Sequence, residues 1–158
     1  MSIDDNKPIY VVDTNVLFGF AMLNPLEFKL EFWSKFEKAL EEKSWILLDV
    51  VVGEVTHDGE LKRWCKKQEN SGFITIIDDE IRNLAVEINN KYPMINAETG
   101  NSSVDPFLIA FASKNALGVF TKEIHKTPLD SLYKIPDVCS ALEIPCIKNP
   151  MRFMRSIG

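Results

Sequence analysis

The sequence predicts a single α/β domain built around a largely parallel sheet. Short apolar runs alternate with longer segments of helical periodicity, which is typical of strands joined by helical crossovers. The first apolar run is continuous rather than alternating, which indicates a strand buried on both faces. With 158 residues, no internal repeat and no low-complexity linker, the chain has the length of one ordinary domain. We therefore expect one domain over residues 1–158, with residues 1–8 as a flexible N-terminal segment.

The first half of the chain contains one helix with a clear start. Asn24 is placed as its N-cap, Pro25 at its first helical position, and Glu27 to complete a capping box. The segment 50–55 is ambiguous, because three valines favour a strand while the residues after them have a helical pattern. We expect strands over 9–13 and 45–49 and helices over 24–43 and 54–70. For the segment 50–55, strand and helix both remain open.

The second half of the chain contains the helix with the strongest signals. Pro106 suits the first turn of this helix, and Gly118 stands where a left-handed C-terminal cap is expected. In order, we expect strands over 73–77, 119–121 and 145–148, the last at a sheet edge, and helices over 78–92, 102–118, 135–144 and 149–155.

The composition excludes several classes of protein. No apolar run approaches the roughly 18 residues of a membrane span, and the acidic N-terminus lacks the apolar core of a signal peptide. We therefore expect a cytoplasmic protein with no membrane partner. The net charge of −5 argues against a protein that coats nucleic acid by bulk attraction. It does not exclude a nuclease, because clustered catalytic acids contribute to that sum.

The cysteines and histidines argue against a zinc site or a disulfide framework. The three cysteines form no C-x-x-C pair, and only two histidines are available to join them. Free thiols in a reducing compartment are the simpler interpretation. These residues are Cys65, Cys139, Cys146, His57 and His125.

Four acidic residues lie at the boundaries of the predicted elements. Asp13 follows the first strand, Asp105 precedes Pro106 at a helix start, Glu123 follows the strand 119–121, and Glu54 follows the second strand. Because ligands of parallel sheets bind outside the carboxyl ends of the strands, these acids could converge there. Each has an ordinary alternative as a cap, a loop residue or a surface charge. Asp13 is the hardest to explain that way, because a carboxylate at the end of a buried run needs partners.

Convergence of these acids would narrow their chemistry. Two carboxylates about 4 Å apart repel by roughly 4 kcal/mol at an effective dielectric constant of 20, so a cluster needs protons or a cation. Oxygen ligands without thiolate or imidazole suit Mg²⁺ or Mn²⁺ better than zinc. Such ions activate water and stabilise the leaving oxygen when a phosphodiester is hydrolysed.

In this order, the residues resemble the PIN-domain family of metal-dependent ribonucleases, which includes the VapC-type toxins of prokaryotic toxin–antitoxin pairs. The resemblance runs from residue 9 to about residue 125, and the remainder is similar to a PIN subfamily with an "IPDVC" element near its end. The matching stretches are "VVDTNVL" with Asp13, Thr14 and Asn15, "VVVGEV" with Glu54, "SSVDPFLIAFA" with Asp105, and "VFTKE" with Glu123.

The resemblance implies a three-layer α/β/α sandwich with a mostly parallel sheet of four to five strands. It also implies an Mg²⁺- or Mn²⁺-dependent endoribonuclease that cleaves single-stranded or structured RNA, as the toxin of a toxin–antitoxin pair. By residue-by-residue matching, it assigns Asp13, Glu54 and Asp105 as metal ligands, Glu123 as a fourth acid acting directly or through water, and Thr14, Asn15 and Thr121 as side chains that orient the ligands.

One departure from the family pattern concerns the fourth acid. Many PIN domains have Asp in a "T-x-D" motif where this chain has Thr121, Lys122 and Glu123. Glu is one methylene longer than Asp, which alters its reach to the metal. Asp137, in "IPDVC", is a candidate substitute acid, and its alternative role is that of an N-terminal helix residue.

Binding to an RNA backbone requires cations. Lys122 adjoins the acids, and the C-terminal segment offers Lys148, Arg152 and Arg155, so these four are candidate phosphate contacts. The basic run in residues 61–70 has the pattern of a solvated amphipathic helix.

The resemblance also suggests partners: an antitoxin that inserts a helix or an arginine into the acidic site, and a second copy of the chain in a homodimer. The aromatic face formed by Phe28, Phe32 and Phe36 is a candidate partner surface, with core packing as its alternative.

Two other functions fit parts of the sequence. A catalytically weak or inactive PIN-like module would bind RNA or a protein without cleaving it. A phosphatase of the haloacid dehalogenase class also begins with an Asp after a buried strand, but it needs a second Asp two positions on. This chain has Asn15 there, which argues against the phosphatase.

Overall fold

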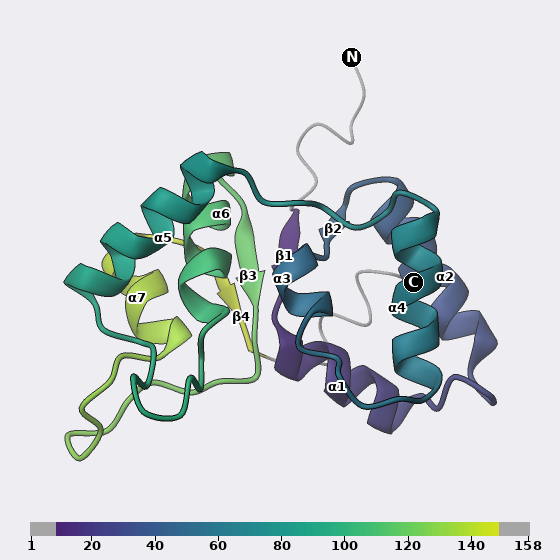
Figure 1. Cartoon of the computed structure of the whole chain (residues 1–158), viewed down its shortest axis with the longest axis horizontal. Helices are drawn as coiled ribbons and strands as arrows, with labels where there is room; N and C mark the ends of the chain where they lie inside the picture. Colours follow the sequence, from purple (N-terminus) through teal and green to yellow (C-terminus); the bar gives the residue numbers. More distant parts are fainter. Residues whose placement is uncertain (1–8, 149–158) are drawn as a thin grey trace.

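The structure is a computed structural model that describes residues 9–148 (Figure 1). The expected helix over 149–155, with the candidate contacts Arg152 and Arg155, lies outside the described residues, as do residues 1–8. Within the described part of the chain, no helix is long and apolar enough to cross a membrane.

A four-stranded parallel sheet forms the centre of the fold. Its order is β2-β1-β3-β4, so the two strands from the middle of the sheet come from distant parts of the chain. Val11 pairs with Ile46 on one side and Val119 on the other, which explains why the first apolar run is buried on both faces. The strands are β1 (Tyr10–Val12), β2 (Trp45–Ile46), β3 (Gly118–Phe120) and β4 (Cys146–Ile147).

Seven helices in the described residues cover the sheet. In Figure 1, α5, α6 and α7 lie on one side of the strands and α1, α2 and α4 on the other, so the three-layer α/β/α prediction is confirmed. The helices are α1 (Thr14–Leu23), α2 (Leu30–Glu41), α3 (Asp49–Val52), α4 (Glu60–Asn70), α5 (Asp79–Lys91), α6 (Asp105–Asn115) and α7 (Ile135–Ala141).

Aromatic rings fill the core between α1, α2, α4 and the sheet. Phe36 is fully buried, and its ring centroid lies 5.7 Å from that of Phe20 and 5.1 Å from that of Trp45. Phe32 packs edge-on against Phe20 at 5.2 Å. Two rings of the candidate partner surface are therefore core residues, whereas Phe28 is 78% exposed.

The expected start of the helix over 24–43 is wrong. Asn24 ends α1 instead: its backbone N–H donates to the carbonyl of Phe20 at 2.8 Å, and its side-chain amide donates to the same oxygen. A turn follows, in which the N–H of Lys29 bonds the carbonyl of Pro25, and α2 begins at Leu30. The indole N–H of Trp33 donates to the carbonyl of Asn24 at 2.7 Å, so a tertiary contact stabilises this arrangement over the capping box.

The segment 50–55 is helical at its start, and the expected strand over 73–77 is reduced to one bridge. The bridge joins Leu48 and Thr75. The side chain of Asp49 opens α3 by accepting from the N–H of Val50, and it also accepts from the N–H of Ile77 at 3.3 Å. The expected helix over 54–70 is shorter at its start, because α4 begins at Glu60.

Gly118 does not cap the preceding helix. The left-handed residue is Ala116, with φ of 55°, and its N–H donates to the carbonyl of Ala112. Gly118 instead begins β3, where a Cβ would lie 2.7 Å from the ring of Tyr10. The glycine is needed for close approach of the strand to this ring rather than for a turn.

Candidate active site at the carboxyl edge of the sheet

Asp13 stands where β1 ends and α1 begins. Its backbone N–H donates to the carbonyl of Phe120, which extends the β1–β3 ladder by one bond, and its carbonyl accepts from Val16 and Leu17. The chain therefore changes from strand to helix at this residue, and its carboxylate lies at the carboxyl edge of the sheet. Only 2% of Asp13 is exposed, so its carboxylate depends on neighbouring groups rather than on water.

Thr121 supplies the partner of this buried carboxylate. Thr121 directly follows β3, is fully buried, and donates from Oγ1 to Oδ2 of Asp13 at 2.7 Å. The same hydroxyl accepts from the backbone N–H of Glu123 at 3.1 Å. One side chain thus links the ends of two adjacent strands and fixes the start of the segment that carries Glu123.

Thr14 connects α1 to the acid that follows α3. Its Oγ1 donates to Oε1 of Glu54 at 2.7 Å, across 40 residues of sequence. Glu54 is exposed and its N–H bonds the carbonyl of Val51, so it sits at the end of a turn beyond α3. The Thr14 hydroxyl therefore holds Glu54, while the Thr14 backbone hydrogen-bonds Asp13.

Asp105 is the first residue of α6 and is only 6% exposed. Burial and, to a smaller extent, the charges of Glu123, Asp13 and Glu54 together raise the pKa of Asp105 to about 9, against an opposing hydrogen bond from Ser102. The pKa of Asp13 is raised to about 6, mainly by burial and also by the charges of Glu123 and Glu54, while hydrogen bonds from the Thr121 hydroxyl and the Thr14 backbone oppose the rise. The charges of Glu54 and Glu123 thus act on both buried aspartates.

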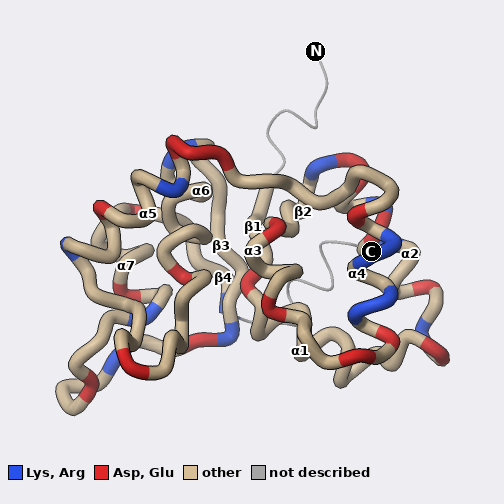
Figure 2. The backbone as a smooth tube through the Cα atoms, in the orientation of Figure 1, with Lys and Arg blue, Asp and Glu red and all other residues tan. Residues whose placement is uncertain are grey.

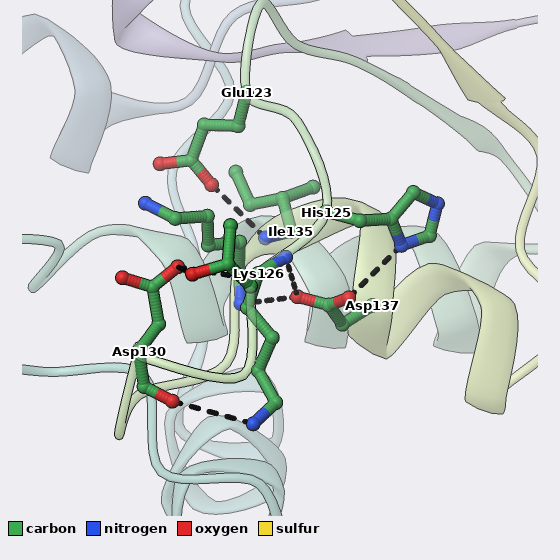
Figure 3. Close-up of polar contacts among 8 residues, drawn as sticks. Glu123, His125, Lys126, Asp130, Ile135 and Asp137 are labelled. Carbon is green, nitrogen blue, oxygen red and sulfur yellow. Dashed lines mark hydrogen bonds and ion pairs between the residues drawn. The ribbon is translucent and has the colours of Figure 1, made fainter.

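The Glu123 carboxylate is held by the start of α7, which follows it after a loop of eleven residues. Glu123 is half-buried, and its Oε1 accepts from the backbone N–H of Ile135, the first residue of α7, at 2.9 Å (Figure 3). Asp137 lies in the same network but makes different contacts. Its Oδ2 accepts from the N–H groups of Lys126 and Lys134, and its Oδ1 lies 2.9 Å from Nδ1 of His125.

Most of the chain matches a known family. A family model described as "Domain of unknown function (DUF4411)" matches residues 10–158. The chain belongs to the DUF4411 family. No curated protein matches it significantly.

Solved structures resemble the DUF4411 chain in fold. The crystal structure of FitAcB from Neisseria gonorrhoeae matches 90% of this chain and 99% of its own, with 17% identity and a TM-score of 0.50. The structure of FitAB bound to an IR36 DNA fragment matches 90% of this chain and 95% of its own, with 18% identity and a TM-score of 0.49. The crystal structure of PAE2754 from Pyrobaculum aerophilum matches 99% of this chain and 95% of its own, with 12% identity and a TM-score of 0.45. At such low identity the FitAcB likeness bears on fold alone, and that fold is PIN-like.

The acids of this DUF4411 chain suit a divalent cation by their chemistry. All are oxygen donors, and the pKa values of Asp13 and Asp105 are raised partly by the other acids, a repulsion that a cation would relieve. As they are placed, no three His, Cys, Asp or Glu side chains within residues 9–148 already form a group that could hold a metal ion.

Three other side chains that the sequence assigns to the site are exposed: Asn15, Lys122 and Lys148. Asn15 is exposed, and within residues 9–148 no hydrogen bond joins it to Asp13. Lys122 is exposed and lies across α1, with Nζ at 3.1 Å from where a Cβ on Gly19 would be. Lys148 is exposed just beyond β4. Lys122 covers Gly19, which explains why this glycine is buried in the middle of α1. The sequence did not predict this contact.

The basic residues of α4 lie apart from Asp13 and Asp105. The three cysteines are free, as expected. In Figure 2 the blue segments of α4 stand out on the side of the molecule opposite α5 and α7. Lys62, Arg63 and Lys66 of α4 line a hollow of about 830 Å³ that also reaches Gly53, the residue before Glu54.

Proposed function

We propose that this protein is an Mg²⁺- or Mn²⁺-dependent endoribonuclease that acts as the toxin of a toxin–antitoxin pair. The observation that carries the proposal is that Asp13 and Asp105 are both buried, and that the charges of Glu54 and Glu123 add to the rise in pKa that burial causes at each of them. Repulsion between buried carboxylates lowers the stability of the folded protein. A bound cation would offset this repulsion, so the arrangement is better explained by cation binding than by folding.

In this proposal each acid has a distinct role. Asp13, Glu54 and Asp105 bind the cation, and Glu123 is the fourth acid, which acts directly or through water. The cation supplies an activated water and stabilises the leaving oxygen of the phosphodiester. In the metal-free protein Asp105 retains a proton at neutral pH because its pKa is about 9, and it would have to lose this proton in order to hold a cation. Thr121 fixes the orientation of Asp13 throughout.

The substrate and partner assignments rest on weaker support. Lys122 and Lys148 are exposed beside the carboxyl edge, where they can contact RNA phosphates. The PIN-like fold shared with FitAcB agrees with the resemblance to VapC-type toxins, and that resemblance supports an antitoxin as the partner of this chain. A homodimer is part of the same proposal, and light scattering of the purified protein tests it.

A second candidate function is a PIN-like module that binds RNA or protein without cleavage. Two observations favour it: the carboxylates do not form a ready-made ligand group within residues 9–148, and the 830 Å³ hollow lies at α4 rather than at Asp13. Exposed apolar Ile76 and basic Lys62 and Lys66 line this hollow, a combination suited to binding.

Cleavage assays separate the two functions. Single-stranded and hairpin RNAs are incubated with the wild-type protein in Mg²⁺, in Mn²⁺ and in EDTA, alongside Asp13→Asn and Asp105→Asn. Glu31→Gln, which changes an exposed acid of α2, is the matched control. The nuclease proposal expects metal-dependent cleavage by the wild type and the control, and a loss of at least about 100-fold in both site variants. Cleavage that survives both site substitutions would contradict it.

A further inference from the structure

Asp137 closes the segment from Lys126 to Lys134, which is the second half of the loop between β3 and α7. Oδ2 of Asp137 accepts from the N–H of Lys126 at 3.0 Å and from the N–H of Lys134 at 2.9 Å, so it joins the two ends of this segment (Figure 3). His125 bonds the other oxygen. Burial opposes ionisation of Asp137, but the hydrogen bonds from Lys134, His125 and Lys126 outweigh it and hold the pKa below its usual value.

This closure also places the group that holds Glu123. Ile135 follows Lys134 directly, and its N–H donates to Oε1 of Glu123 at 2.9 Å. The side chain of Ile135 is fully buried, which anchors the start of α7 in the core. Glu123 is thus fixed at both ends, by its own N–H on Thr121 and by its carboxylate on Ile135.

We propose that Asp137 is a positioning residue, which sets Glu123 at the acidic site through the loop and the start of α7, and that Asp137 is not itself a metal ligand. The inference rests on the proposed metal-dependent function, because that function requires Glu123 as the fourth acid. It also assigns a role to the "IPDVC" element: Ile135 supplies the N–H, and Asp137 closes the loop that presents it.

The length of the Glu123 side chain explains why such a device is needed. Glu has one more rotatable bond than Asp, and ordering a Glu side chain costs up to about 2 kcal/mol of conformational entropy. A hydrogen bond to Oε1 in the metal-free protein orders the side chain in advance. Within residues 9–148, Oε2 of Glu123 has no hydrogen-bond partner, so it remains available for a cation or its water.

Mn²⁺ affinity, measured by calorimetry on the full chain, tests the inference. Asp137→Ala removes the loop closure and should weaken Mn²⁺ binding by about tenfold. Asp137→Asn removes the charge but keeps an oxygen for the two N–H groups, so its affinity should stay within about threefold of wild type. Asp130→Asn, in the same loop, is the matched control, because among the described residues its carboxylate accepts hydrogen bonds from Thr127 alone.

A double variant tests whether Asp137 acts through Glu123. Glu123→Gln should weaken Mn²⁺ binding, and Glu123→Gln/Asp137→Ala should bind no more weakly than Glu123→Gln alone. Additive losses, or equal losses in Asp137→Asn and Asp137→Ala, would overturn the inference in favour of direct ligation by Asp137.

Hydrogen exchange gives a readout without metal. The amide of Ile135 should lose about tenfold or more of its protection in Asp137→Ala and keep it in Asp137→Asn. If Asp137→Ala fails to fold, Ile135→Pro deletes the N–H directly, and Ile135→Val retains it with a similar loss of side-chain volume. Weaker Mn²⁺ binding in the Pro variant but not in the Val variant then supports the inference, and equal binding overturns it.

The outcomes for Asp137 and for the proposed function are distinct. A wild-type protein that binds Mn²⁺ with these variant effects but cleaves no RNA contradicts only the ribonuclease proposal. A wild-type protein that cleaves RNA with unchanged Mn²⁺ affinity in Asp137→Ala contradicts only the positioning role. A wild-type protein that binds no Mn²⁺ contradicts both.

Discussion

Thr121 and Asp13, 108 residues apart in the chain, are joined by a buried hydrogen bond of 2.7 Å between Oγ1 and Oδ2. The bond ties the end of β3 to the end of β1 and favours the ionised form of a carboxylate that burial makes harder to ionise. The same hydroxyl receives the N–H of Glu123. Thr121 therefore controls both the charge of one acid and the position of another.

Thr121→Val should weaken the site. The substitution leaves Asp13 and the N–H of Glu123 without this partner, which should cost about 1–3 kcal/mol of stability. The pKa of Asp13 should rise further, so Mn²⁺ binding should shift to higher pH. Titrations of Mn²⁺ at several pH values check this shift, and Thr121→Ser, which keeps the hydroxyl, should titrate like the wild type. An unchanged profile in the Val variant would show that the hydroxyl does not tune Asp13.

Asp105→Asn should stabilise the metal-free protein while abolishing cleavage. Burial raises the pKa of Asp105 to about 9 in the folded state, well above its value in the unfolded chain. Its contribution to stability is therefore fully present below about pH 4 and is lost as pH rises toward 9. Asn has no proton to lose, so the variant should gain on the wild type by on the order of 1–3 kcal/mol at pH 8.

Thermal unfolding in EDTA at several pH values between 4 and 9 measures this effect. The difference between Asp105→Asn and the wild type should be smallest near pH 4 and grow with pH. Glu31→Gln should show no such trend, because Glu31 is exposed on α2. Parallel stability curves for Asp105→Asn and the wild type would refute the burial argument.

Mn²⁺ affinity should rise with pH over the range in which the buried acids ionise. The pKa values of Asp13 and Asp105 are raised to about 6 and about 9, so both groups are mainly protonated below pH 6. Each proton released on ligation should increase affinity by up to about tenfold per pH unit. Calorimetry in two buffers of different ionisation enthalpy counts the protons. At pH 7.5 we expect about one proton, from Asp105, and a count of zero would contradict this assignment.

Gly19→Ala should stabilise α1 and weaken RNA binding. Ala is favoured over Gly inside a helix by about 1 kcal/mol, but its Cβ would lie 3.1 Å from Nζ of Lys122 and displace that amine. Binding is measured on the Asp13→Asn background, so that RNA stays intact, and should fall by about threefold to tenfold at low salt. Lys122→Met should cause a similar loss, and the Gly19→Ala/Lys122→Met double variant should lose no more than Lys122→Met. Undiminished binding by Gly19→Ala would remove Lys122 from the RNA contacts.

The sequence predicts the sheet and the location of the acids because both depend on simple rules. Continuous apolar runs around Val11 and Val119 indicate strands buried on both faces, and parallel strands end at one edge. Asp13 follows the first of these strands directly, so its position is fixed once the strand is recognised. Glu123 is placed by the same reasoning, one short turn beyond β3.

The sequence does not predict contacts that depend on tertiary structure. Asn24 before Pro25 has the local features of a helix start, and the Trp33 indole bond that favours a helix end there comes from packing. The partner of Glu123 is a backbone N–H, which any residue except proline at position 135 would supply, so no side chain marks it. Only a glycine within a predicted apolar segment, Gly19, offered a visible sign of the Lys122 contact.

The order of strands in the sheet has a consequence for synthesis of the protein. A growing chain that has reached residue 117 already contains Asp13, Glu54 and Asp105, yet it lacks β3, the strand that lies between β1 and β4. Thr121 and Glu123 follow that strand, and the N–H that holds Glu123 comes later still, at Ile135. Since ribosomes add about 5–20 residues per second, three of the acids emerge well before the segment that completes the site. The arrangement of these side chains is therefore complete only once residue 135 has been synthesised.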